Sequence, residues 1–201
     1  STGASSIARI FMDSCVVDAT GVSTSANLFT LTALDSLGTD PSAAVAEFKR
    51  CLLRNASSLS SSGYFFSQTC QAATCQTLVE IDGCNFRGSV DLSSTVGTLG
   101  TNQFQSLDST VDVPALTPSG VNRFIAGSTQ PNVNTVVNLQ KTLLQTNENN
   151  SELFLNYDYP SLGSASKDTF RLRDVEIVGN GWLPPFAGPS DRPEVIHVRP
   201  N

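Results

Sequence analysis

The sequence is poor in charged residues, in lysine and histidine, and in long apolar runs. Charged residues make up 15% of the 201 residues, against about 25% in an average soluble domain. Only three of the 12 basic residues are lysines, and there is one histidine. A net charge of −6 excludes nucleic acid as a partner, because phosphate binding needs an excess of basic side chains. No apolar run approaches the roughly 18 residues of a membrane-spanning helix, so we expect no membrane span.

Hydroxyl side chains and cysteines are the most informative residues present. The chain has 26 serines and 19 threonines. It also has five cysteines, which all lie in the first 84 residues: Cys15, Cys51, Cys70, Cys75 and Cys84. The spacing of the last three is too irregular for a zinc site, which needs paired hooks of closely spaced ligands. We therefore expect disulfides with one cysteine left over and the pairing open, and we expect Cys51 to be buried.

Two N-x-S sequons predict N-glycosylation, at Asn55 and at Asn149. The first six residues contain neither a basic segment nor an apolar segment, so we expect any signal peptide to have been removed. Together with the expected disulfides, these features predict an extracellular protein, either secreted or associated with a surface.

Short β-branched and aromatic segments, separated by Gly, Pro and Asn, predict a mainly β fold. They cover residues 7–17, 28–33, 77–82, 104–113, 121–126, 133–144, 151–157, 170–178 and 194–198. Their spacing of about 8–12 residues is typical of an antiparallel β-sandwich or jelly-roll-like domain. Residues 135–144 also match a helical period, but we favour a strand there. No internal repeat is evident at 20–50 residues, which argues against a solenoid or a propeller.

One amphipathic helix is expected near residues 41–54. Asp40 suits an N-cap and Pro41 suits the first helical position. Apolar residues follow at i, i+3 and i+7: Val45, Phe48 and Leu52.

We expect residues 1–181 to form one β-sandwich-like domain, with a subdivision near residue 88 as the alternative, because the cysteines end there. Residues 182–201 predict an extended Pro-rich tail, since proline cannot join a central strand. The tail carries large apolar side chains that favour burial against a neighbour. Its expected interface residues are Trp182, Pro184, Pro185 and Phe186.

The sequence offers few groups for catalysis, so we expect no catalytic residue, cofactor or metal site. A Ser-His-Asp triad would have to use His197, which we interpret as an edge-strand residue. Glu80 and Asp82 would share one face of a strand, and Asp158, or Asp174 with Glu176, could oppose them in a carboxylate-dependent hydrolase. Acidic and amide side chains at 80–83 and 147–149 lack the spacing of a calcium loop.

These features favour a non-enzymatic structural subunit that self-assembles into an extracellular filament, coat or matrix. Its partners would be copies of itself or other extracellular subunits, docked through the tail or through strands. One alternative is a monomeric module that binds a glycan or a protein, using Tyr157 and Tyr159, whose rings would share one face of a strand. The second alternative is the small hydrolase built on Glu80 and Asp82.

Overall fold

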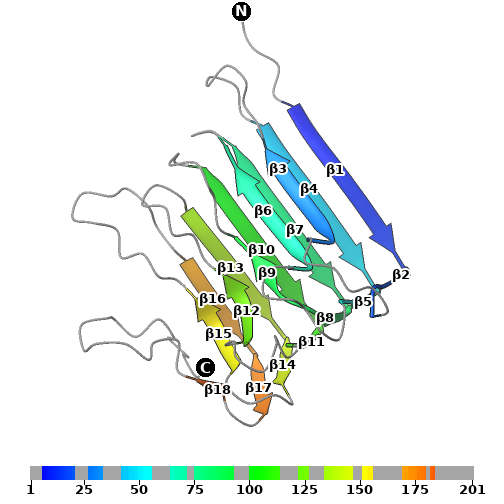
Figure 1. Ribbon diagram of the computed structural model, residues 1–201, viewed down its shortest axis with the longest axis vertical. Coiled ribbons are helices and arrows are strands. Elements are labelled where there is room, and N and C mark those ends of the chain that lie inside the picture. Colours follow the sequence, from blue (N-terminus) through cyan, green and yellow to red (C-terminus); the bar gives the residue numbers. More distant parts are fainter. Residues whose placement is uncertain are drawn as a thin grey trace, which may run out of the picture.

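The chain winds into a β-solenoid in which every strand pairing is parallel (Figure 1). The computed structural model describes residues 6–20, 27–33, 42–55, 64–71, 75–92, 100–113, 122–126, 134–146, 151–155, 169–179 and 182–183. Each coil contributes one strand to each of three six-stranded sheets. The first coil (β1, β2 and β3) therefore lies at one end of all three sheets, and the last coil (β16, β17 and β18) lies at the other.

The strands of each sheet follow the chain at every third element. Sheet A consists of β1 (Ser6–Asp13), β4 (Ser42–Lys49), β7 (Gln76–Asp82), β10 (Thr101–Leu107), β13 (Asn134–Gln140) and β16 (Thr169–Arg173). Sheet B consists of β2 (Val16–Asp18), β5 (Leu52–Arg54), β8 (Asn85–Arg87), β11 (Thr110–Asp112), β14 (Leu143–Thr146) and β17 (Glu176–Gly179). Sheet C consists of β3 (Phe29–Ala33), β6 (Phe66–Cys70), β9 (Val90–Asp91), β12 (Asn122–Ala126), β15 (Ser151–Leu155) and β18 (Trp182–Leu183).

Within sheet A, side chains alternate strictly between the core and the outer face. On β4, Ala44, Ala46 and Phe48 are buried while the residues between them are half-buried. The strands pair without a register shift, so each inward position stacks on an inward position of the next coil. One such inward column runs through all six strands: Met12, Phe48, Ile81, Ser106, Leu139 and Leu172.

The corner between sheets A and B is formed in the same way in every coil. One residue adopts a positive φ there: Ser14 (54°), Arg50 (52°), Gly83 (60°), Asp108 (46°), Lys141 (47°) and Asp174 (53°). A left-handed residue costs roughly 1–2 kcal/mol unless it is glycine, and only Gly83 meets that exception. Ladder hydrogen bonds continue through the corner, for example from Arg50 N to Asp82 O at 2.8 Å. The corner reverses the alternation, so that the residue after it faces the interior.

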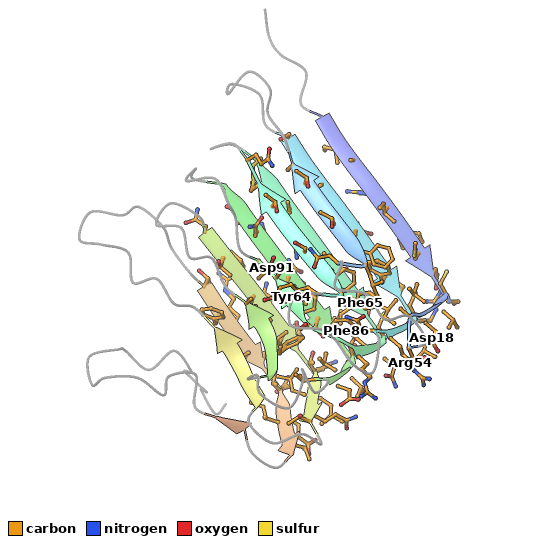
Figure 2. All side chains as sticks on the ribbon, viewed as in Figure 1. Asp18, Arg54, Tyr64, Phe65, Phe86 and Asp91 are labelled. Carbon is orange, nitrogen blue, oxygen red and sulfur yellow. A yellow bond between two sulfur atoms is a disulfide. The ribbon has the colours of Figure 1, made fainter. Side chains whose placement is uncertain are left out.

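The core is dominated by phenylalanines that come from all three sheets. Six of them are fully buried: Phe48, Phe65, Phe66, Phe86, Phe104 and Phe124. The ring centroid of Phe65 lies 4.7 Å from that of Phe66 and 5.2 Å from that of Phe86, in the edge-to-face arrangement that aromatic pairs prefer. Figure 2 shows Phe65 and Phe86 together between the sheets. Gly88 is packed so closely that a Cβ there would lie 2.8 Å from the Phe86 ring.

The expected antiparallel β-sandwich is wrong, because all three sheets are parallel. Short strands separated by turns occur in both β-sandwiches and β-solenoids. Their spacing along the sequence does not reveal whether a strand pairs with the next strand, as in a sandwich, or with the strand three elements later, as here. The expected absence of a repeat is also wrong. Each coil is one repeat unit and contains one A–B corner. The residue after the corner recurs 33 residues later from position 51 to 84, from 109 to 142 and from 142 to 175.

The expected helix near residues 41–54 is wrong, because these residues form β4 and β5 with a corner between them. The apparent helical stripe combines residues from both faces of the strands, because Phe48 is buried in the core whereas Val45 and Leu52 alternate with buried residues and are only half-buried. Residues 135–144 are strands, as expected, divided between β13 and β14. The sheets continue through residue 88 without a break, and the expected tail begins with β18, which pairs with β15.

Replacing Phe86 with alanine tests this core. Phe86 contacts four other rings, and the cavity left behind is expected to lower the free energy of unfolding by about 3–5 kcal/mol. Urea denaturation measures this loss, with the exposed Arg171→Ala as the control, expected to change stability by less than about 0.5 kcal/mol. A loss no greater than the control's would contradict the solenoid core.

Candidate functional site

Large exposed apolar side chains among the described residues are confined to the two ends of the solenoid. Four lie on the first coil: Ile7 (65% exposed), Ile10 (46%), Phe11 (55%) and Val16 (68%). We call these four residues the first-coil edge. The other two, Ile177 and Val178, lie on β17 of the last coil. Sequence reasoning placed the first-coil edge in a strand but did not identify it as a site.

Two residues of the first-coil edge are large and apolar at outward positions where later coils carry small or polar side chains. Phe11 stacks in an outward column that continues with Glu47, Glu80, Gln105, Asn138 and Arg171. Ile7 stacks in an outward column that continues with Ala43, Gln76, Thr101 and Asn134. The exposure of Ile7 and Phe11 therefore comes from their outward positions, and not only from their place at an end. Comparison of aligned coils is the signal that would have revealed this in the sequence.

Ile10 is exposed for a different reason. It belongs to an inward column in which Ala46, Val79, Phe104 and Val137 are all fully buried. Each of those residues is covered by a coil on both sides, whereas Ile10 has a coil on one side only. Ile10 therefore adds an exposed inward side chain to the apolar outer ones, while Leu31 and Ala33 on β3 of the same coil are buried.

The charged side chains of the first coil are paired within their own chain. Arg9 Nε lies 3.6 Å from a carboxylate oxygen of Glu47 on β4, and the Arg50 guanidinium pairs with Asp13. The carboxylate of Asp18 accepts hydrogen bonds from Thr20 N (2.9 Å) and Thr20 Oγ1 (2.7 Å), which lower the pKa of Asp18. Figure 2 shows Asp18 and Arg54 on the neighbouring strands β2 and β5. These charges are fixed by local partners and do not shield the backbone edge of β1.

The outer face of sheet A carries a shallow groove of about 440 Å³ toward the last coil. Its polar side chains come from β7, β10, β13 and β16: Glu80, Gln105, Asn138, Gln140, Arg171 and Arg173. The amides lie between an acidic side and a basic side, which suits an uncharged ligand rich in hydroxyl groups. This arrangement offers hydrogen bonds rather than a strong electrostatic field.

Of the partners expected for the hydrolase acids Glu80 and Asp82, Asp174 and Glu176 do not lie beside them, and Asp158 lies outside the described residues. Glu80 and Asp82 do share the outer face of β7, as alternate residues. Asp174 follows β16, three strands away in sheet A and thus about 14 Å distant at the usual strand spacing. Glu176 lies on β17 in sheet B. The separation exceeds the range of about 5–10 Å that a pair of catalytic carboxylates needs.

The cysteines form one disulfide and one stacked column. Cys70 and Cys75 are bonded, with their Cα atoms 5.7 Å apart, while Cys15, Cys51 and Cys84 are free thiols. More thiols are therefore left over than the single one expected. Cys51 is buried, although on a corner rather than on a helix.

The three free thiols begin a column that we call the corner column, which follows the positive-φ residue in every coil. Its members are Cys15, Cys51, Cys84, Ser109, Thr142 and Val175. Cys84 Sγ lies 3.4 Å from Asp82 O and accepts from Cys51 N at 3.4 Å. Ser109 Oγ repeats this pattern, donating to Leu107 O at 2.7 Å and accepting from Cys84 N at 3.0 Å. The thiols thus have a structural role, as small donors and acceptors that satisfy the corner.

Several expected site residues cannot be placed. The following lie outside the described residues: Asn149, Tyr157, Asp158, Tyr159, Pro184, Pro185, Phe186 and His197. Trp182 is described only as part of β18. Asn55 follows β5 and is 1% exposed, so the folded chain leaves little room for a glycan there. Across the described ranges, no group of acidic, histidine or cysteine side chains could hold a metal ion. No helix that could cross a membrane occurs in that same part of the chain.

Comparisons with protein-family models, curated proteins and solved structures give no match to this chain.

The pH dependence of stability tests the corner column. Burial raises the pKa of the Cys84 thiol above its ordinary value of 9.0. Above pH 9 the unfolded chain therefore loses this proton first, and the stability contributed by Cys84 is lost as the pH rises, by at most about 1.4 kcal/mol per pH unit. Between pH 8 and pH 10, Cys84→Ser should lose less stability to urea than wild type, because a serine hydroxyl does not ionise in this range. Ser109 shows that the corner accepts a serine. Equal losses in the two proteins would contradict the assignment.

Proposed function

We propose that this protein is a non-enzymatic structural subunit that self-associates through its first-coil edge. The observation that carries the proposal is that the large apolar side chains of Ile7 and Phe11 stand where later coils carry polar side chains or the small Ala43. Both lie on β1, the terminal strand of sheet A. An exposed terminal strand with apolar side chains is a template for pairing with another chain.

The energetics favour contact with a partner strand. Covering an exposed apolar side chain contributes roughly 1.5–3 kcal/mol when burial is complete, and the first-coil edge has four such side chains. Terminal strands usually resist pairing through unpaired charges, prolines or bulges. On β1 the charges of Arg9 and Asp13 already have partners on the next coil, so a strand that approaches β1 meets less repulsion.

An extracellular setting remains part of the proposal. The Cys70–Cys75 disulfide supports it, because such bonds persist in oxidising compartments. The low charge and the abundance of hydroxyl side chains are compatible with a coat, filament or matrix protein. The buried free thiols Cys51 and Cys84 are enclosed by the corner column and hence protected from exchange.

The oligomeric state tests the proposal. Wild-type protein should form species larger than 21.3 kDa that increase with concentration, measured by light scattering and mass photometry. The double variant Ile7→Lys/Phe11→Lys should remain a single subunit, because two charges would be buried in any contact. Its matched control is Gln76→Lys/Gln105→Lys, the same charges in the same two columns of inner coils, which should assemble like wild type. A wild-type protein that stays a single subunit at every concentration overturns the proposal.

A second candidate function, favoured by the groove on sheet A, is binding of a polyhydroxylated ligand such as a glycan. The amides of Gln105 and Asn138 line that groove in neighbouring strands. Gln105→Ala/Asn138→Ala should reduce binding on a glycan array at least tenfold and leave the oligomeric state unchanged, whereas the exposed Gln76→Ala on β7 should do neither. If wild type binds no glycan on the array, this candidate is rejected.

A further inference from the structure

We propose that the partner of the first-coil edge is the last coil of a second copy, stacked head to tail with β16 of one copy parallel to β1 of the next. This inference rests on the proposed function and names its contact. The order of the strands allows the arrangement, because each sheet has a first-coil strand at one end and a last-coil strand at the other (Figure 1). One stacking step continues sheets A and B at an unshifted register, whereas in sheet C that register places residues 182–183 ahead of β3 rather than beside it.

The inward columns match across such a contact. Continuing the register of sheet A without a shift places Phe170 beside Ile10 and Leu172 beside Met12. Phe170, Leu172 and Met12 are partly buried and pack against the core, and Ile10 is 46% exposed. Stacking therefore covers Ile10 of one copy with Phe170 of the other, as happens between successive coils inside the solenoid.

The outward columns of sheet A match in charge. The unshifted register places Arg171 beside Phe11 and Arg173 beside Asp13. Arg173 is exposed, and its column already alternates in sign at Asp13, Lys49 and Asp82, so a cation beside Asp13 continues the pattern. Phe11 already has the Lys49 ammonium 6.0 Å from its ring centroid, and an arginine is the preferred cation for an aromatic face.

In sheet B the outward pairs are mixed. Val16 would lie beside Glu176 and Asp18 beside Val178, and these pairs neither favour nor oppose the contact. The inward pair of the same sheet is apolar, with Val17 beside Ile177. Sheet A, with its longer strands and its two arginines, therefore sets the register.

A symmetric contact between two first coils fits less well. The second chain would wind in the opposite sense, so that three-residue β2 would face five-residue β3 and the corners would not coincide. A head-to-tail contact is heterologous and does not close, so it leads to a linear fibre.

Disulfide trapping tests both the partner and the register. In a Cys15→Ser background, Phe11→Cys and Arg171→Cys would be neighbours on adjacent parallel strands, about 4.8 Å apart at their Cα atoms, within the range of about 4.4–6.8 Å that a disulfide accepts. A chain carrying both substitutions should give a ladder of oligomers on a non-reducing gel after mild oxidation, and the ladder should collapse on reduction. Serine suits position 15, since Ser109 occupies the same corner column.

The control is a cysteine pair displaced by two residues along the strand, on the same outward face. Arg9→Cys with Arg171→Cys differs by two residues in register, about 8 Å between Cα atoms at standard strand dimensions, which is too far to bridge. It should give less than a tenth of the cross-linked product of the matched pair. Equal products from the two pairs would overturn the register.

The remaining outcomes separate the inference from the proposed function. One outcome is that wild type assembles, that Ile7→Lys/Phe11→Lys prevents assembly, and that Phe11→Cys alone gives only a cross-linked dimer. The contact then joins two first coils, so the head-to-tail inference fails while the proposed function stands. If wild type assembles through the first-coil edge and no cysteine pair cross-links, the inference fails in the same way. If wild type is a single subunit and nothing cross-links, both are overturned.

Discussion

The structure depends on parallel strand pairing without any register shift. Because Phe48 lies directly over Ile81, and Ile81 over Ser106, every residue has to suit the residues above and below it as well as its own strand. Neighbouring coils are about 4.8 Å apart. The side chains stacked in one column therefore have to point in the same direction and to be compatible in polarity. This constraint explains why the same inward and outward pattern recurs although the residues themselves differ from coil to coil.

The constraint is strictest at the A–B corner. A residue with positive φ turns the chain, and a small side chain after it bonds to a carbonyl two residues earlier. Cysteine, serine and threonine serve equally there, because each offers one donor and one acceptor on a short side chain. The cysteines that suggested a disulfide framework are, in three of five cases, members of this column. Their chemistry resembles that of the hydroxyl residues that replace them in later coils.

Sequence reasoning could predict strands but not how they pair. Alternation in residues 28–33 and 77–82 correctly indicated strands, since burial on one face is a local property. The repeat was missed because it lies in residue classes rather than identities. Glu47–Arg54 and Glu80–Arg87 share only Glu, Cys and Arg at matching positions. The interval also falls to 25 residues between positions 84 and 109, so a search for a fixed period fails. The first-coil edge could be recognised only after the coils had been aligned.

The two ends of the solenoid differ, and this difference determines how copies can meet. Inner coils are covered on both sides, whereas β1 of the first coil leaves the inward side chain of Ile10 46% exposed. Here the first coil becomes more apolar at Ile7 and Phe11, while the last coil carries Arg171 and Arg173 at its outward positions. Unlike ends therefore complement each other better than like ends. In the proposed assembly, each head-to-tail addition covers one end and presents another of the same kind, so every step has the same free energy and growth has no preferred stopping size.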